Sequence, residues 1–178
     1  MQNHPLPIPE SYWVEPGRLL AGEYPGAYDD EQARKRLEAF LAAGFDTFID
    51  LTQAGELMPY APILRKQARA YSLQINYHRR AIGDFGLPTI AQMKTTLNLI
   101  DDALDGGHKV YIHCWGGIGR TGTTVGCYLA RHGMTGAQAL AQLAEWWRSV
   151  PKSARNPHSP ETAAQRTFIH EWPEQSNE

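Results

Sequence analysis

Hydrophobic positions along the chain recur with two different periods. Between Asp30 and Ala43, the apolar side chains of Ala33, Leu37 and Phe40 lie three or four residues apart, which is the spacing of an amphipathic helix. The β-branched and aromatic run from Phe45 to Leu51 instead predicts a strand. The same criteria predict further helices at 60–71, 89–105, 121–132, 135–150 and 159–172, and further strands at 12–14, 18–21, 74–78 and 109–113.

The order of these elements predicts the fold class. Strands that alternate with helices favour a parallel sheet covered by helices, and the apolar centre of Lys109 to His113 is typical of a strand buried on both faces. We therefore expect an α/β fold, a single domain with a central, mostly parallel sheet flanked by helices. Residues 11–173 are assigned to this domain, residues 1–10 to a proline-rich N-terminal arm, and residues 174–178 to a frayed tail.

Composition excludes several classes of protein. The 178 residues suffice for one core, and the formal net charge of -2 gives no overall attraction to nucleic acid. No apolar run reaches the length of a membrane span, so membrane insertion is not expected. The first ten residues lack the basic and apolar regions of a signal peptide, which predicts a cytoplasmic location. Two cysteines provide neither a disulfide framework nor a metal cluster, so we expect no metal and no cofactor.

The sequence HCWGGIGRTG follows the strand at 109–113 and carries the candidate chemistry. Gly117 to Gly122 fits G-x-G-x-x-G, a pattern found in dinucleotide-binding loops. That interpretation also requires an acidic residue about twenty positions downstream, at the end of a second parallel strand. Glu145 is the only acid between Gly122 and Val150, and it falls within a predicted helix. The dinucleotide interpretation is therefore weak.

The alternative interpretation uses every residue type in the loop. Backbone N–H groups of a glycine-rich turn can point inward around an anion, and the following helix adds a partial positive charge. Arg120 follows Cys114 by six positions, where its planar guanidinium can bind two oxygens of a phosphate. The same positive field favours the thiolate form of Cys114, which is the nucleophilic form. The phosphate-binding residues are expected to be Trp115, Gly116, Gly117, Ile118, Gly119 and Arg120.

Two flanking side chains are expected to support the nucleophile. His113 is predicted to brace the loop by hydrogen bonds and to influence the ionisation of the thiol, with a plain strand-end histidine as the alternative. The Thr121 hydroxyl is predicted to donate to the sulfur when it becomes a leaving group, with an ordinary helix N-cap as the alternative.

His113-Cys114-x5-Arg120-Thr121-Gly122 resembles the signature HCx5R(S/T)G of the cysteine-dependent protein tyrosine phosphatase superfamily. The chain length is similar to that of the small dual-specificity-like branch. The resemblance implies a general acid on a loop ahead of the signature. Asp84 stands thirty residues before Cys114, between a predicted strand and a predicted helix, and is the candidate for that role. An aspartate that only shapes the turn is the alternative.

Other residues near the predicted site allow more than one interpretation. The segment from Ser159 to Gln165 resembles the glutamine-containing loop of larger family members, which would give Gln165 a role in positioning water, but Glu161 replaces the first glutamine. A helix that begins with Ser159 as its cap is the alternative. Glu56 is assigned to a solvated loop, in preference to an ion pair with Arg120. The ring of Trp115 is expected to pack beneath the loop, with a position at the rim of the pocket as the alternative.

The expected function is hydrolysis of phosphate monoesters through a phosphocysteine on Cys114, with Asp84 as general acid and base. The expected partner is a phosphorylated protein or peptide, with phosphotyrosine first and phosphoserine or phosphothreonine next, and phosphate-like oxyanions should bind the empty loop. Phosphoinositides are ranked lower because residues 115–119 contain no lysine. Two alternatives stay open: a phosphate-binding module with a vestigial site, and a redox enzyme that uses Cys114 with Cys127.

Overall fold

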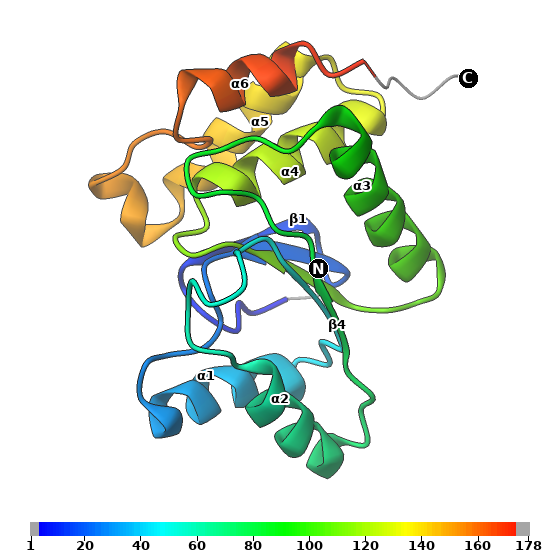
Figure 1. Ribbon diagram of the computed structural model, residues 1–178, viewed down its shortest axis with the longest axis vertical. Helices are drawn as coiled ribbons and strands as arrows, with labels where there is room; N and C mark the ends of the chain where they lie inside the picture. Colours follow the sequence, from blue (N-terminus) through cyan, green and yellow to red (C-terminus); the bar gives the residue numbers. More distant parts are fainter. Residues whose placement is uncertain (1–3, 174–178) are drawn as a thin grey trace.

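A five-stranded sheet with helices on both faces forms the body of the protein in the computed structural model, which describes residues 4–173 (Figure 1). The strand order is β1-β2-β5-β3-β4. β1 runs antiparallel to β2, whereas all other neighbouring strands are parallel, so the expected mostly parallel sheet is confirmed. The strands are β1 (Ser11–Glu15), β2 (Leu19–Gly22), β3 (Thr47–Asp50), β4 (Asn76–Arg79) and β5 (Val110–His113).

Helices cover the sheet in two groups (Figure 1). The first group is α1 (Asp30–Ala42) and α2 (Ala61–Ala68), which continues into the short 3-10 helix η1 (Arg69–Tyr71). The second group lies on the opposite face and is α3 (Ile90–Asp105), α4 (Gly119–Arg131), α5 (Gly136–Arg148) and α6 (Ala163–His170), with the 3-10 helix η2 (Pro151–Ala154) after α5.

Side chains that alternate in direction along the strands divide the core into two clusters, one on each face of the sheet. Leu20, Phe48 and Tyr111 pack against α1 and α2, whereas their strand neighbours Ile49 and Ile112 pack against α3 to α6. All of these side chains are buried. Because successive side chains of a strand point to opposite faces, each buried strand contributes to both clusters.

The parallel strands end together at one edge of the sheet. Gly22 of β2 and Asp50 of β3 both lie beside His113 of β5, and Arg79 of β4 lies beside Asp50. The loops that follow these strands therefore meet at one place, which is the usual location of a ligand site in such folds. The signature loop after β5 lies between the other loops.

Several element boundaries differ from those predicted. The helix expected at 121–132 begins two residues earlier, at Gly119, so Arg120 lies in its first turn. The helix expected at 159–172 begins at Ala163, and its N-cap is Thr162 rather than Ser159. A reciprocal capping box between Thr162 and Gln165 fixes this start, since the two side chains satisfy backbone N–H groups that the helix leaves unpaired.

The predicted N-terminal arm packs against the domain where it is described. Ile8 is buried in the cluster beneath α1 and α2, and the Trp13 indole donates a hydrogen bond to the His4 carbonyl. The predicted tail at 174–178 lies outside the described residues.

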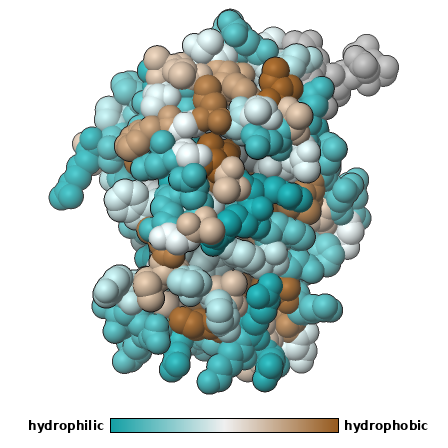
Figure 2. Space-filling view, in the orientation of Figure 1, coloured by the Kyte–Doolittle hydropathy of each residue, from teal (hydrophilic) through white to brown (hydrophobic). Residues whose placement is uncertain are grey.

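The surface shown in Figure 2 is largely hydrophilic, with apolar side chains in small separate patches. No helix within residues 4–173 is long and apolar enough to cross a membrane. The aromatic residues near the C-terminus close the core as expected: Trp147 and Trp172 are buried, and Trp146 and Phe168 pack against them.

Candidate active site

Cys114 is the first residue after β5, and its thiol faces the interior of the signature loop. The residue is buried, with 3% of its surface exposed. The backbone N–H of Gly117 donates to its Sγ atom at 3.3 Å. Residues 114–120 thus curl around the sulfur, which is the geometry that the spacing of Cys114 and Arg120 predicts.

Carbonyl groups of the loop are held from outside by side chains and by one backbone group. The His113 ring contacts the Cys114 carbonyl at 2.9 Å, and the Ser159 hydroxyl donates to the Ile118 carbonyl at 2.7 Å. Two of the three carbonyls between them also have external donors: Trp115 accepts from the Tyr24 N–H and Gly116 from the Lys152 ammonium.

This arrangement determines which backbone groups face the centre of the loop. Because carbonyl oxygens are held outward, the N–H groups of the same turn are free to converge on an anion near the Cys114 sulfur. α4 begins at Gly119, so its N-terminal partial charge is directed at the same point. The loop is therefore built to bind an oxyanion.

Gly117 is required by two independent features of the loop. Its φ is +74°, in the left-handed region, and a Cβ placed on it would lie 2.5 Å from the carbonyl carbon of Gly22. The positive φ disfavours any residue with a side chain. The short Cβ distance means that only glycine lets the loop lie against the end of β2.

The Gly117→Ala variant is therefore expected to lose phosphate and vanadate affinity by at least about 100-fold, which is the cost of displacing several N–H donors. Gly44→Ala is the matched control, because Gly44 has a φ of +84° but no atom within 4 Å of an added Cβ. The control should lose only about 1 kcal/mol of stability and keep its anion affinity. Calorimetric titration measures the affinities. Equal anion binding by the two variants would contradict the proposed close packing.

His113 is completely buried beneath the loop, on the α1 and α2 side of the sheet. Burial lowers its pKa, so the ring is neutral near pH 7. Since a carbonyl only accepts, Nδ1 carries the proton and donates to the Cys114 oxygen, and the Tyr60 hydroxyl donates to Nε2 at 2.6 Å. His113 thus makes the hydrogen bond to the loop that the predicted bracing role requires, and Tyr60 holds the other side of its ring.

Arg120 is 98% buried, and two carboxylates contact its guanidinium. Glu56 accepts from both terminal nitrogens, at 2.9 and 2.6 Å. Asp84 accepts from one of them at 3.2 Å. Nitrogen Nη1 also donates to the Ile82 carbonyl, at 3.0 Å. These contacts fix the guanidinium of Arg120. Its charge is compensated from two loops, the loop after β3 that carries Glu56 and the loop after β4 that carries Asp84.

Asp84 lies in the loop between β4 and α3, where the sequence places the candidate acid. Its side chain is 46% exposed, and its Oδ1 also accepts from the Phe85 N–H. Phe85 has a φ of +57°, which is uncommon for a residue with a side chain. The loop is attached at two points, since Arg120 donates to Ile82 and Gln165 donates to Gly86.

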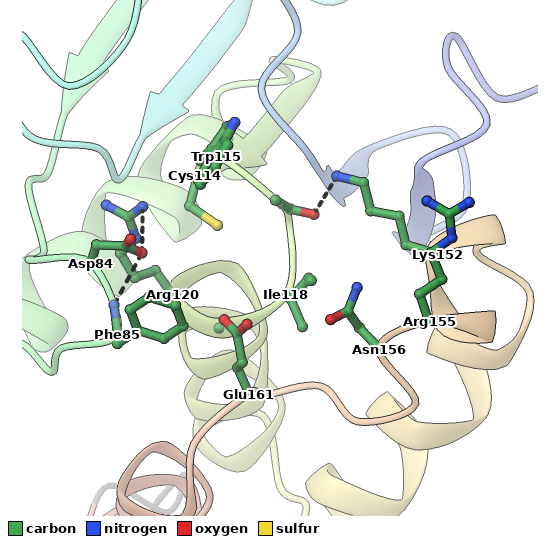
Figure 3. A pocket seen from close by; sticks show the side chains of 12 residues that line it. Asp84, Phe85, Cys114, Trp115, Ile118, Arg120, Lys152, Arg155, Asn156 and Glu161 are labelled. Atoms are coloured by element: carbon green, nitrogen blue, oxygen red, sulfur yellow. Dashed lines mark hydrogen bonds and ion pairs between the residues drawn. The ribbon is translucent and has the colours of Figure 1, made fainter.

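A cavity of about 430 Å³ opens above the sulfur (Figure 3). Cys114 and residues of the signature loop form its floor, and Asp84 and Phe85 form one wall. Across from them lie three residues that follow α5, namely Lys152, Arg155 and Asn156. Glu161 projects its carboxylate from a third side. Burial and, to a smaller extent, the negative charge of Asp84 raise the pKa of this carboxylate.

The model of one protein family matches residues 9–176 of the chain: PTP-SAK, described as a Swiss Army Knife protein with a DSP-PTPase phosphatase domain. The chain belongs to this family. It is thus a phosphatase domain of the cysteine-dependent protein tyrosine phosphatase superfamily, in the dual-specificity branch, and the resemblance found in the sequence is confirmed.

Individual relatives agree with this placement. The phosphatase domain is 28% identical over 170 residues to mouse "Protein tyrosine phosphatase domain-containing protein 1", covering 91% of the chain but 21% of the relative. Among solved structures, kinase associated phosphatase (KAP) superimposes with a TM-score of 0.67 at 24% identity, covering 86% of this chain and 84% of KAP. PTPMT1 in complex with PI(5)P gives 0.66 at 18% identity, covering 92% and 94%.

Two residues of the phosphatase domain do not lie where the sequence predicted them. Glu56 was assigned to solvent, but it makes the closest ion pair of Arg120. The ring of Trp115 was expected to pack beneath the loop, but the residue is 60% exposed at the cavity. Both predictions were wrong for the same reason. The position of each side chain depends on segments that are distant in sequence, and no periodic pattern signals it.

The Glu56→Gln variant of the phosphatase domain is expected to unfold about 1–3 kcal/mol more easily at pH 7, since it leaves a buried guanidinium short of one counter-charge. The hydrogen bonds from Arg120 lower the pKa of Glu56. A lowered pKa means that the pair stabilises the fold above the unfolded-chain value of about 4.3, and that this contribution is lost as the pH falls through the folded-state pKa. Urea unfolding at pH 7 and pH 3 measures the difference, which should shrink at pH 3.

Glu145→Gln, on the exposed surface of α5, is the control for removal of a surface glutamate and should match the wild type within about 0.5 kcal/mol. A Glu56→Gln variant as stable as the wild type at pH 7 would contradict the structural importance of the pair.

Gln165 is buried, and its side chain is occupied by structural contacts. Its Oε1 accepts from the N–H groups of Glu161 and Thr162, while its Nε2 donates to the Gly86 carbonyl at 3.2 Å. These contacts place Gln165 as a link between α6 and the Asp84 loop. These contacts are those of the structural alternative for Gln165, and the role in positioning water stays a prediction.

The other residues predicted for the site lie in the signature loop or in the helix α4 that follows it. Thr121 is buried in α4, and its hydroxyl donates to the Gly22 carbonyl at 3.4 Å; Ile118, not Thr121, is the N-cap. Gly116, Ile118 and Gly119 line the cavity floor. Cys127 is buried within α4 as expected, and it forms no disulfide with Cys114.

Three supporting residues were missed altogether, and sequence patterns gave little indication of them. Tyr24, Lys152 and Ser159 hold loop carbonyls, yet they come from three different segments, namely the loop after β2, the 3-10 helix η2 and the loop before α6. Lys152 also forms an ion pair with Glu23. Only the meeting of these segments at one sheet edge makes them part of the site.

Proposed function

We propose that this phosphatase domain hydrolyses phosphate monoesters through a covalent phosphocysteine on Cys114. The outward anchoring of the loop carbonyls carries the proposal, because it leaves converging N–H donors above a buried sulfur. A site of this kind suits a phosphoryl group, whose equatorial oxygens carry the charge that the donors stabilise.

In the first step, the Cys114 thiolate attacks phosphorus in line with the bond to the leaving oxygen. The sulfur–phosphorus bond forms as the phosphorus–oxygen bond breaks. The N–H groups of residues 115–120 and the Arg120 guanidinium hold the three equatorial oxygens. The incoming phosphate replaces the Asp84 carboxylate on Arg120, which releases Asp84 to take up a proton from solvent and to face the leaving oxygen.

Asp84 then handles the proton in both steps. It protonates the leaving oxygen in the first step, because an alkoxide or phenolate is a poor leaving group. In the second step the ionised Asp84 takes a proton from water, whose oxygen attacks phosphorus and expels the Cys114 thiolate. Attachment of its loop at Ile82 and Gly86 keeps the carboxylate near the cavity.

His113 and Thr121 are assigned supporting roles in this mechanism. His113 orients the Cys114 carbonyl away from the substrate and, as a neutral ring, adds no competing charge beneath the loop. Thr121 is buried beside the loop, and its hydroxyl is assigned to the sulfur when the sulfur departs. The movement required is a rotation of the hydroxyl away from the Gly22 carbonyl.

Phosphotyrosine in proteins is the substrate that the cavity favours. Phe85 and Trp115 both line it, and each is 60% exposed, so an aromatic leaving group would cover apolar surface on them. KAP, with the same fold, is named a kinase associated phosphatase. Phosphoserine and phosphothreonine share the phosphoryl group but offer less surface to these rings.

A phosphoinositide is the second candidate, and one wall of the cavity favours it. Lys152 and Arg155 place two cationic side chains beside the signature loop, although the loop itself contains no lysine. Additional phosphates of an inositol ring would suit such a wall. PTPMT1, which shares the fold, has been solved in complex with PI(5)P.

Steady-state turnover of p-nitrophenyl phosphate, phosphotyrosine peptides and inositol phosphates tests the proposal. We expect turnover of the aryl phosphate that is inhibited by vanadate, with phosphotyrosine peptides preferred over inositol phosphates. Phosphate binding without any turnover would overturn the proposal and favour a vestigial phosphate-binding module. Thiol-dependent reductase activity without phosphatase activity would instead favour the redox alternative.

A further inference from the structure

Trp115 separates the catalytic cavity from a second hollow of about 220 Å³. The indole follows the nucleophile directly and lines both spaces, although the residue is 60% exposed. Residues from the loop after β2 and from α1 form the rest of the hollow: Glu23, Tyr24, Gly26, Ala27, Gln32 and Arg36. A substrate that extends beyond its phosphorylated group in this direction must therefore cross the indole.

Trp115 is fixed in this position by its backbone. Its carbonyl accepts from the Tyr24 N–H at 3.0 Å, which joins the signature loop to one side of the hollow. The two spaces are thereby held next to each other by a direct hydrogen bond. An exposed indole on a backbone held in this way can gain apolar contact when a substrate binds beside the nucleophile.

The charged side chains that line the hollow have partners of opposite charge. Arg36 is the only cationic residue among those that line it within the described chain, and it pairs with Glu23 at 2.8 Å and donates to the Tyr24 carbonyl. An inositol headgroup with further phosphates would find no unpaired cation there. The apolar part of the hollow is supplied by Tyr24, Ala27 and the Trp115 indole, whereas Glu23, Gln32 and Arg36 supply its polar part. A neutral side chain is the occupant that this surface suits, and an apolar one covers the indole without requiring a counter-charge.

We infer that Trp115 and this hollow form a subsite for an apolar residue next to the phosphorylated residue of an extended peptide substrate. This inference rests on the proposed phosphatase activity and specifies its substrate class. The phosphorylated side chain enters the catalytic cavity, the neighbouring chain crosses Trp115, and the adjacent side chain fills the hollow. Trp115 is in this sense a specificity-determining residue.

The test compares phosphotyrosine peptides that carry leucine, alanine or aspartate at each position within two residues of the phosphotyrosine. For each peptide, kcat/KM is divided by the value for p-nitrophenyl phosphate, which is too small to reach the hollow. We expect leucine to exceed aspartate by about tenfold at one of these positions, the scale of one apolar contact. Ala27→Trp, which fills the hollow, and Trp115→Ala, which removes its wall, should both abolish this preference.

Ala141→Trp is the matched control, because it places the same side chain in a separate hollow bordered by α5 and by the turn between α4 and α5. It should retain the leucine preference. Gln32→Trp, at an exposed position of α1 in the same hollow as Ala27, provides a second blocking variant if Ala27→Trp fails to fold. Thermal unfolding identifies the folded variants.

The outcomes separate this inference from the proposed function. Absence of p-nitrophenyl phosphate turnover in the wild type would overturn both. Turnover without a leucine preference, or a preference that survives in the folded blocking variants, would overturn only the peptide subsite. Faster turnover of phosphatidylinositol phosphate vesicles than of any peptide, unaffected by Ala27→Trp, would overturn it as well and identify a lipid substrate.

Discussion

Cys114→Ser is expected to reduce turnover of an aryl phosphate by at least about 10⁴-fold, the scale on which removal of an enzyme nucleophile acts. A serine hydroxyl stays protonated in the environment that favours a thiolate, so it cannot attack phosphorus at a useful rate. The converging N–H groups and Arg120 do not depend on the sulfur, so the variant should still bind a phosphotyrosine peptide. Steady-state kinetics and calorimetric titration measure the two properties.

Cys127→Ser provides the matched control for this experiment. Cys127 is buried in α4, away from the cavity lining, so its replacement changes a buried thiol outside the proposed machinery. Activity per folded molecule should stay within about twofold of the wild type. Full activity in Cys114→Ser would exclude the covalent mechanism.

Asp84→Asn is expected to reduce kcat for phosphotyrosine peptides by about 10²–10⁴-fold, the usual contribution of general acid catalysis. Asparagine keeps the size of the side chain and can still contact the loop, but it has no acidic proton to give. The effect should depend on the leaving group. Tyrosine has a hydroxyl pKa of about 10 and needs protonation, whereas nitrophenolate is a far better leaving group and should be affected much less.

The dependence on the leaving group distinguishes acid catalysis from a structural role. A variant that merely disturbed Arg120 would bind phosphate more weakly and would lose activity equally with every substrate. Asp102→Asn, at an exposed position of α3, is the control and should leave both substrates unaffected. A uniform loss in Asp84→Asn would remove Asp84 from the mechanism.

The sequence predicted the layers of the fold because their determinants are local. Apolar spacing identified α1, and the same criterion identified the buried strand β5. Reciprocal capping boxes at Thr89 and Thr135 begin the helices predicted at 89–105 and 135–150, and each box involves side chains three residues apart. The same rule applied to Thr162 and Gln165 would have corrected the start of α6.

Residue chemistry predicted the part of the candidate site that is contiguous in sequence, and the family resemblance added Asp84 from a separate loop. Spacing placed Cys114 and Arg120 at the two ends of one turn, and the structure shows that turn curled around the sulfur. Glu56, by contrast, is 64 residues from Arg120 in sequence and lies in a loop that has no periodicity to interpret. Its pairing with Arg120 follows from the positions of β3 and β5, whose ends lie side by side.

The sequence by itself determined the α/β layers, the position of the nucleophile and the anion-binding turn, because helix periodicity, strand alternation and loop chemistry act over a few neighbouring residues. Only the tertiary structure decided which distant groups hold that turn open and what surrounds its mouth. Ser159 reaches Ile118 across 41 residues, and Trp115 stays exposed because the loop after β2 fixes its backbone rather than covering its ring. Such contacts depend on where loops converge at the sheet edge, which no local pattern of residues records.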